Sequence, residues 1–459
     1  MQKFLKIVFI LFIVFIIYNT LIPFRIITDL QQVQKNLQNI QYIPYLNKGV
    51  GFSLTDIAGN ILLFIPFGFL IFILLNNKNA FTKLFLSILF GFIFSLFIEI
   101  SQLFFHGRTS SLLDLAMNTT GTFFGALAAL VYLKIFSAKA NKWLKYFLSH
   151  EKATLIVVLF IGAQVIGAAI PFNVTITVSD IKKSFKKTNI TPFEYSPLGE
   201  KLGFKIKEKT KNENVFSCIE FWEDVLLYSI YGYFVFMSYF LYWKNQKRAI
   251  LKLLFFLILI FPMIEFMQFF INSRISDLND VLSAYFGVIF GGGILFIEKR
   301  NWFPEKSHLS FTDLRIPIIL YIIFLFYTGL KPFQFSLETS VLAQDLKSEH
   351  LIPFFSYFKK TSVWNIYDIF ETSIAFVPIG LILNIFLKDK MGKGNITFIV
   401  VLVSFCFGLI IETGQVFLAD RIGEITDILL YCLGGYLGIL LYRWYENELL
   451  PEIQKDESG

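Results

Sequence analysis

The sequence predicts an all-α, polytopic integral membrane protein with about twelve transmembrane helices, arranged as three parallel four-helix repeats. Composition predicts the membrane location, because 55% of the 459 residues are hydrophobic and only 16% are charged, whereas soluble proteins carry about 25% charged residues. A polar motif that recurs three times with one spacing predicts the repeats. This composition excludes a soluble globular enzyme, a disordered chain and a nucleic-acid-binding domain.

The predicted helices are continuous apolar runs that are long enough, or nearly so, for a span of roughly 20 residues. They cover residues 4–22, 57–76, 81–105, 112–136, 152–170, 219–243, 248–271, 278–298, 314–331, 366–387, 395–417 and 424–445. The first run lacks a small-residue cleavage site and leads into Pro23-Phe24, so we expect a retained helix rather than a signal peptide.

Basic residues in the connections predict a multi-pass protein of the cell membrane with both termini in the cytoplasm. Alternating the spans from an inner N terminus places the lysine-rich connections 134–145 and 244–248 inside. Each short outer loop then carries one basic residue, and the long outer segment 171–218 counts little, because long translocated segments have little influence on orientation.

Self-comparison shows one polar pattern three times, Glu-x2-Gln-x5-Arg-x5-Asp-x6-Gly-x3-Gly. Helix packing alone does not require this set of polar residues, since the residues between the anchors differ freely. The three copies are Glu99, Gln102, Arg108, Asp114, Gly121 and Gly125; Glu265, Gln268, Arg274, Asp280, Gly287 and Gly291; and Glu412, Gln415, Arg421, Asp427, Gly434 and Gly438.

The upstream part of each copy repeats as well. Each first helix ends in Pro-Phe, a second proline follows 21 residues later, and an acid opens the second helix twelve residues before a glycine. The second prolines are Pro44, Pro192 and Pro353, and the acids are Asp56, Glu220 and Asp368. Four helices is an even number, so the repeats are predicted to be parallel. Their predicted boundaries are 1–140, 141–305 (with the outer loop 171–218) and 306–459 (with a cytoplasmic tail).

The first copy reads Asp56-x3-Asn60-x5-Pro66-Phe67-Gly68, then Glu99-x2-Gln102, Arg108 and Asp114-x3-Asn118-x2-Gly121. This pattern resembles the VanZ-like family of membrane proteins, which is named for a teicoplanin-resistance protein. The resemblance covers nearly the whole chain, and each repeat is similar to one VanZ-like domain. It implies a fold, a site and glycopeptide resistance as a class of phenotype. The later copies depart from the pattern: Asn60 becomes Asp224 and Thr372, and Asn118 becomes Ala284 and Tyr431.

The spacing predicts how the anchors lie. Glu99 and Gln102 share one helix face near its outer end, and Asp114 suits the N-terminal dipole of the returning helix. The glycines after Asp114 form a stripe that we expect to pack on the Glu-Gln helix. Arg108, in the outer turn, is expected within salt-bridge reach of Asp114, and the equivalent pairs are expected in the other repeats.

The candidate site in the first repeat comprises Asp56, Asn60, Glu99, Gln102, Arg108, Asp114 and Asn118. The equivalent residues are Glu220, Glu265, Gln268, Arg274, Asp280, Asp368, Glu412, Gln415, Arg421 and Asp427. Ionisable groups within a membrane are costly and usually mark a functional site. The alternative is structural: these groups could satisfy one another and stabilise each four-helix unit without binding a ligand.

The residues leave three functions open. The first is a non-enzymatic protein of the cell envelope whose outward polar cluster engages membrane lipids, lipid-linked cell-wall precursors or amphiphilic glycopeptide antibiotics. The second is a membrane-embedded enzyme that acts on a lipid-linked substrate at the outer leaflet, with a carboxylate as base. The third is a transporter, disfavoured because the anchors lie at the outer edge rather than at the midplane. No cofactor, metal or nucleic-acid partner is predicted.

Overall fold

The computed structural model describes residues 2–21, 25–38, 54–76, 78–169, 178–188, 192–193, 217–271, 274–298, 311–338, 350, 352–359, 363–418, 421–451 and 453. The regular elements within these ranges are helices, and pairing of extended backbone is limited to two isolated bridges, Ile26 with Phe105 and Phe335 with Leu418. The predicted all-α class is confirmed.

In the described part of the chain, ten helical segments are long and apolar enough to cross a membrane. They are formed by α3 (Leu54–Leu74), α4 (Ala80–Gln102), α5 (Leu112–Val131), α7 (Lys152–Ala169), α10 (Cys218–Ser238), α11 with α12 (Ala249–Leu254 and Ile260–Gln268), α13 (Leu278–Glu298), α17 (Val363–Leu387), α18 (Lys393–Gln415) and α19 (Ile425–Trp444). Two further predicted spans contain shorter apolar stretches, Val8–Leu21 within α1 (Gln2–Leu21) and α14 (Arg315–Leu330). The chain is therefore a polytopic helical membrane protein, while the count of twelve spans stays a prediction.

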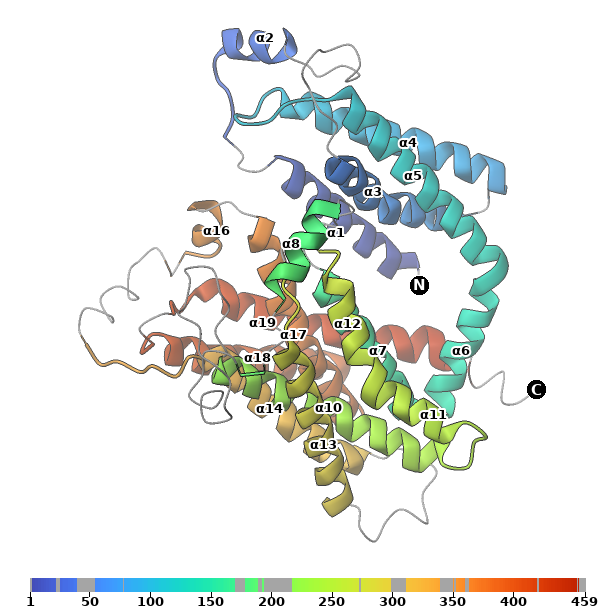
Figure 1. Ribbon diagram of the computed structural model, residues 1–459, viewed down its shortest axis with the longest axis vertical. Helices are drawn as coiled ribbons and strands as arrows, with labels where there is room; N and C mark the ends of the chain where they lie inside the picture. Colours follow the sequence, from blue (N-terminus) through green and yellow to red (C-terminus); the bar gives the residue numbers. More distant parts are fainter. Residues whose placement is uncertain are drawn as a thin grey trace. The chain divides into compact units, whose positions relative to one another are not determined.

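The remaining helices are short or polar and join the apolar ones (Figure 1). They are α2 (Leu30–Gln38), α6 (Ser137–Ser149), α8 (Val178–Lys187) and α16 (Phe355–Lys359). By Cα proximity the chain divides into two compact units. Unit 1 contains residues 1–142, 347–408 and 424–459, and unit 2 contains residues 143–346 and 409–423. The predicted repeat boundaries stay a prediction.

Within each repeat the most extensive helix contact joins the second and fourth helices: α3 with α5, α10 with α13, and α17 with α19. The motif glycines make this contact possible. A Cβ at Gly121 would lie 2.3 Å from the carbonyl oxygen of Ile61, and one at Gly125 would lie 1.9 Å from that of Ile65. Small residues let membrane helices approach to backbone contact, and only glycine fits here.

The expectation that this stripe packs on the Glu-Gln helix was therefore wrong, because Gly121 and Gly125 face α3 rather than α4. The reason is a small residue on α3 itself: a Cβ at Gly68 would lie 2.1 Å from the carbonyl oxygen of Thr122. With glycines on both sides, the two backbones interlock. Helix α4 packs on another part of α5, where Gly91 meets the side chain of Thr122.

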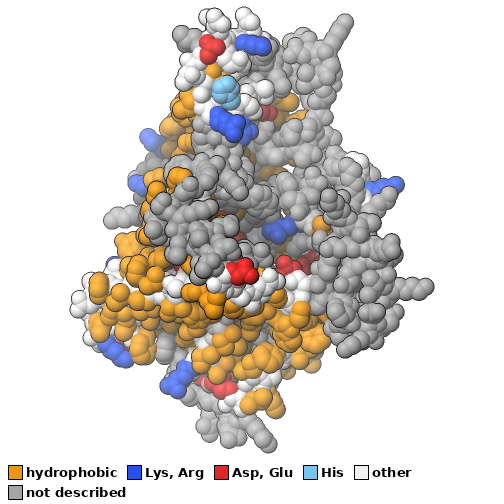
Figure 2. Space-filling view, turned by 90° about the vertical axis from the view of Figure 1, so that its left-hand side faces the viewer, with side chains coloured by type: hydrophobic (Ala, Val, Ile, Leu, Met, Phe, Trp, Pro, Cys, Tyr) orange, Lys and Arg blue, Asp and Glu red, His pale blue; other side chains and the backbone are white. Residues whose placement is uncertain are grey.

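Apolar side chains cover much of the described part of the face that Figure 2 displays, where they are coloured orange. Examples are Phe81, Ile289, Ile297 and Phe398, all more than two-thirds exposed. Soluble monomers rarely expose large contiguous apolar patches. Such a surface fits a protein that lies in a membrane.

Candidate functional site

The motif glutamate of the first repeat joins the end of one helix to the start of the next. Glu99, only 5% exposed near the end of α4, accepts hydrogen bonds at Oε2 from Ser111 N at 2.7 Å and from Ser110 Oγ at 3.1 Å. Ser111 is the N-cap of α5, where its hydroxyl accepts from Asp114 N. The first amides of a helix lack intrahelical acceptors. The Glu99 carboxylate therefore supplies the acceptor that the Ser111 amide would otherwise lack.

The second repeat repeats this contact. Glu265 Oε2 accepts from the backbone amide of Asp277 at 3.1 Å. The donor lies twelve residues after the glutamate in both repeats, at Ser111 and at Asp277. The recurring glutamate therefore has a recurring structural contact at the start of the fourth helix.

The motif arginines contact the C-terminal end of the first helix of their repeat. Arg108 Nη2 donates to Asn19 O at 3.2 Å, Arg274 Nη2 donates to Gly167 O at 3.0 Å, and Arg421 Nε donates to Lys331 O at 3.2 Å. The last carbonyls of a helix lack intrahelical donors and carry partial negative charge, which favours a cation there. Burial lowers the pKa of the Arg108 guanidinium from its ordinary value.

Two of the three motif glutamines contact the same helix ends. Gln102 Nε2 donates to Thr20 O at 3.3 Å, and Gln415 Nε2 donates to Gly329 O at 2.9 Å. Gln268 differs, because its Nε2 lies 3.4 Å from Glu265 Oε1. The sequence predicted these side chains at one end of the helices, and it did not predict their backbone partners. The predicted pairing of each arginine with the aspartate six residues on stays a prediction.

The asparagines that distinguish the first repeat lie between its helices. Asn60 of α3 donates from Nδ2 to Asp114 Oδ1 at 2.8 Å, and Asn118 of α5 donates from Nδ2 to Ser95 Oγ of α4 at 3.0 Å. Asn60, Asp114, Ser95 and Asn118 thus connect three helices. Asp56 lies in the first turn of α3, and its side chain is outside the described residues.

Two amide oxygens in this cluster are buried and, among the described residues, accept no hydrogen bond: Gln102 Oε1 and Asn118 Oδ1. Their side chains are 8% and 3% exposed. A buried acceptor without a donor costs about 1–3 kcal/mol. These two oxygens are the part of the first repeat's cluster whose hydrogen bonding is incomplete among the described residues.

The second repeat places acids where the first has amides. Asp224 replaces Asn60 and accepts from Ser283 Oγ at 3.1 Å. The carboxylates of Asp224, Glu265 and Asp280 lie close enough to interact electrostatically. Glu220 is exposed in the first turn of α10. This repeat keeps the positions of the cluster and changes its chemistry.

In the third repeat a tyrosine of the short helix α16 contacts the predicted acid. The hydroxyl of Tyr357, on α16, donates to Asp368 Oδ2. Burial, followed by the nearby Asp368 carboxylate, raises the pKa of Tyr357 from its ordinary value. Beside it, Ser356 Oγ donates to Glu424 Oε2 at 2.6 Å.

Sequence reasoning missed Tyr357. Lys48 and Ser196 occupy the equivalent positions, four residues after the second proline. Comparison of the repeats therefore did not identify a tyrosine at this position. The other third-repeat anchors fall in different units: Asp427 lies in the first turn of α19 in unit 1, whereas Glu412 is buried in unit 2.

The second proline of the repeats marks a loop that contacts the fourth helix, which sequence reasoning also missed. The residue after it donates its backbone amide to a side chain: Phe193 N to Asn279 Oδ1, and Phe354 N to Thr426 Oγ1, each at 2.9 Å. Phe193 and Phe354 both have positive φ, 56° and 62°. Asn279 and Thr426 each lie fourteen residues after the motif glutamate. The signal was present in the spacing of the prolines.

Residues 7–135 and 318–446 match the model of the VanZ/LLP1 family. The chain belongs to the VanZ/LLP1 family. The matched ranges contain the first and third copies of the motif, so the predicted resemblance and its tandem arrangement are confirmed.

One curated relative is Protein VanZ of Enterococcus faecium, which is 30% identical over 125 residues. The aligned region covers 27% of this chain and 70% of that protein. No solved structure matches the chain. Across the described residues, no group of three or more His, Cys, Asp or Glu side chains is arranged to hold a metal ion.

Proposed function

We propose that this VanZ/LLP1 protein is a non-enzymatic component of the cell envelope that binds a donor-rich ligand through the polar cluster of its first repeat. Ligands of this kind are lipid head groups that carry hydroxyl or amino groups, lipid-linked cell-wall precursors and glycopeptide-type antibiotics. The supporting observation is the pair of buried acceptors, Gln102 Oε1 and Asn118 Oδ1. Similarity to a protein named VanZ supports antibiotic resistance as the phenotype.

The differences among the repeats favour the first as the binding repeat. It carries amides beside Asp114, whereas the second carries the carboxylates of Asp224 and Asp280. In the third, Tyr357 already donates to Asp368. The second and third repeats thus act mainly as scaffold. The arginines do not discriminate among the repeats, because all three contact the end of a first helix.

Asn118→Ala is therefore expected to weaken ligand binding, because it removes a buried acceptor. Loss of one hydrogen bond of about 1.4 kcal/mol would weaken binding about tenfold. The measurement is binding of teicoplanin, of a lipid-linked wall precursor and of ethanolamine phospholipid to the purified full chain. Growth of cells expressing each variant in teicoplanin gives the phenotype.

The matched control is Tyr431→Phe, at the equivalent position of the third repeat, which should leave binding unchanged. Equal losses from both variants would contradict the assignment to the first repeat. Unchanged binding in Asn118→Ala would contradict the proposal itself. Chemical conversion of the precursor by the wild-type protein would favour the enzyme alternative.

We also propose that the protein resides in the cell membrane with both termini in the cytoplasm, so that the cluster faces outward. The support is the distribution of basic residues described above. In a background without native cysteines, Thr109→Cys should react with an impermeant thiol reagent added to intact cells. Lys142→Cys should react only after lysis, and labelling of Lys142→Cys in intact cells would refute this topology.

A further inference from the structure

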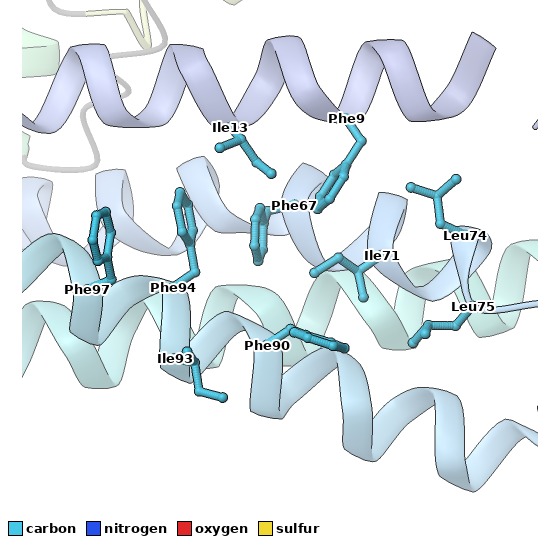
Figure 3. Close-up of a pocket in the computed structure, with 10 residues that line it drawn as sticks. All are labelled: Phe9, Ile13, Phe67, Ile71, Leu74, Leu75, Phe90, Ile93, Phe94 and Phe97. Carbon is cyan, nitrogen blue, oxygen red and sulfur yellow. The ribbon is translucent and has the colours of Figure 1, made fainter. Parts of the chain in front are cut away.

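An apolar groove of about 490 Å³ lies in the first repeat, lined by side chains of α1, α3 and α4 and the residue that follows α3 (Figure 3). Its volume is in the range of roughly 300–1,000 Å³ that ligand pockets occupy. Every lining side chain is a phenylalanine, an isoleucine or a leucine. The ring of Phe67 forms part of the wall, 4.9 Å from the ring of Phe94 and 5.4 Å from that of Phe9.

The groove suits a hydrocarbon ligand and not a polar one. A polar ligand would lose its hydrogen bonds to water and find none in this lining. Helices α3 and α4 are candidate membrane spans, and the α4 side of the groove is open, since Phe90, Ile93 and Phe97 are about half exposed. The groove therefore opens toward the hydrocarbon of the bilayer. Over residues 90–97 of α4 it extends about 10 Å at 1.5 Å per residue.

Lysines lie toward one end of the groove. Figure 3 shows Leu74 and Leu75 at one end and Phe97 at the other, with Phe9 and Phe90 between them. At the first end, Lys6 precedes Phe9 by three residues, Lys78 lies in the turn after α3, and Lys83 lies in the first turns of α4.

The two segments that carry these lysines and line the groove contain no acidic residue. Neither residues 2–21 nor residues 57–98 contain an acid. Juxtamembrane lysines attract anionic lipid head groups by about 1 kcal/mol each. The charge of this end of the groove therefore complements a phosphate.

The second repeat makes different contacts at the equivalent positions. Tyr231, at the position of Phe67, donates its hydroxyl to the carbonyl oxygen of Phe256 at 2.8 Å, a contact that phenylalanine cannot make. Phe256, at the position of Phe90, also stacks on Trp243 with ring centroids 5.3 Å apart. The side chains that line the groove in the first repeat are therefore not all conserved in type in the second.

We propose that this groove binds one acyl chain of an anionic phospholipid, with the phosphate held at the end marked by Lys6, Lys78 and Lys83. The inference does not rest on the function proposed above, because Glu99 and Gln102 lie near the opposite end of α4. It places a lipid in the leaflet opposite to the polar cluster. The attraction is packing of the chain against the groove walls, since lipid tails are as apolar as the lining itself.

The test uses the purified full chain and native mass spectrometry with phosphatidylglycerol and phosphatidylcholine of identical acyl chains. Ile93→Trp places a larger side chain in the groove. Retention of phosphatidylglycerol should fall about tenfold, which corresponds to about 1.4 kcal/mol. Phe92→Trp, at the neighbouring lipid-facing position that does not line the groove, should retain the lipid as the wild type does. Equal retention in both variants, or equal loss, overturns the proposal.

The double variant Lys6→Gln/Lys83→Gln addresses the head group. It should reduce the preference for phosphatidylglycerol over phosphatidylcholine by about fivefold or more, given the attraction per lysine. An unchanged preference overturns the assignment of the phosphate.

A measurement on the wild type avoids any effect of substitution on folding. Phosphatidylglycerol with a diazirine in its acyl chain should label residues 9–13, 67–75 and 90–97 above the other spans. Uniform labelling of all spans contradicts a specific groove.

Discussion

Gly291→Ala should destabilise the protein strongly, whereas Gly293→Ala, two residues further along the same helix, should not. A Cβ at Gly291 would lie 1.9 Å from the carbonyl oxygen of Ser229 and 2.7 Å from its carbonyl carbon. A Cβ at Gly293 would meet no atom within 4 Å among the described residues. Overpacking costs about 1–3 kcal/mol when side chains can adjust. Here the obstacle is backbone, so we expect a loss of about 3 kcal/mol or more.

The expected effect of Gly293→Ala has the opposite sign. Alanine is favoured over glycine in a helix interior by about 1 kcal/mol, and the open space leaves this gain intact. Thermal unfolding of the detergent-solubilised variants and their monodispersity on size exclusion measure both effects. Similar midpoints for the two variants would show that α10 and α13 do not interlock through Gly291.

The sequence predicted the small face of each fourth helix, but not the helix that this face contacts. A stripe such as Gly121 and Gly125 specifies a surface on one helix. The neighbour depends on which other helix carries a matching small residue, and Gly68 on α3 was part of the same motif. Two complementary glycine positions are a stronger signal than one stripe, and they identify the second helix as the partner.

Sequence reasoning named the candidate residues but not most of the groups that they contact. Glu99 and Arg108 were identified by their triplicate spacing, yet they contact Ser111 N and Asn19 O. Every residue carries a backbone amide and carbonyl, so such partners leave no residue-type signature in a sequence. The hydrogen bond from the Tyr357 hydroxyl to Asp368 was not predicted for another reason, because a tyrosine occurs at this position in one repeat only.

Glu99→Leu should destabilise the first repeat by about 3 kcal/mol, because it removes the acceptor that two buried donors share. The amide of Ser111 and the hydroxyl of Ser110 are both buried and both donate to this carboxylate. A buried donor left unpaired costs about 1–3 kcal/mol. The loss should be local, so amide hydrogen exchange should accelerate first at the start of α5. Glu220→Leu, at an exposed position in α10, is the control and should change little.

Glu99→Gln then separates scaffold from ligand contact. The glutamine keeps an oxygen that can accept from Ser111 N, so the loss of stability should be much smaller than with leucine. If Glu99→Gln folds normally and still binds the ligand of the first repeat, the glutamate serves only to join α4 to α5. If it folds normally and loses binding, the charge of Glu99 acts on the ligand as well. A Glu99→Leu variant as stable as the wild type would contradict a stabilising role of the hydrogen bond between Glu99 and Ser111 N. The same result would then be expected for the equivalent bond between Glu265 and the amide of Asp277.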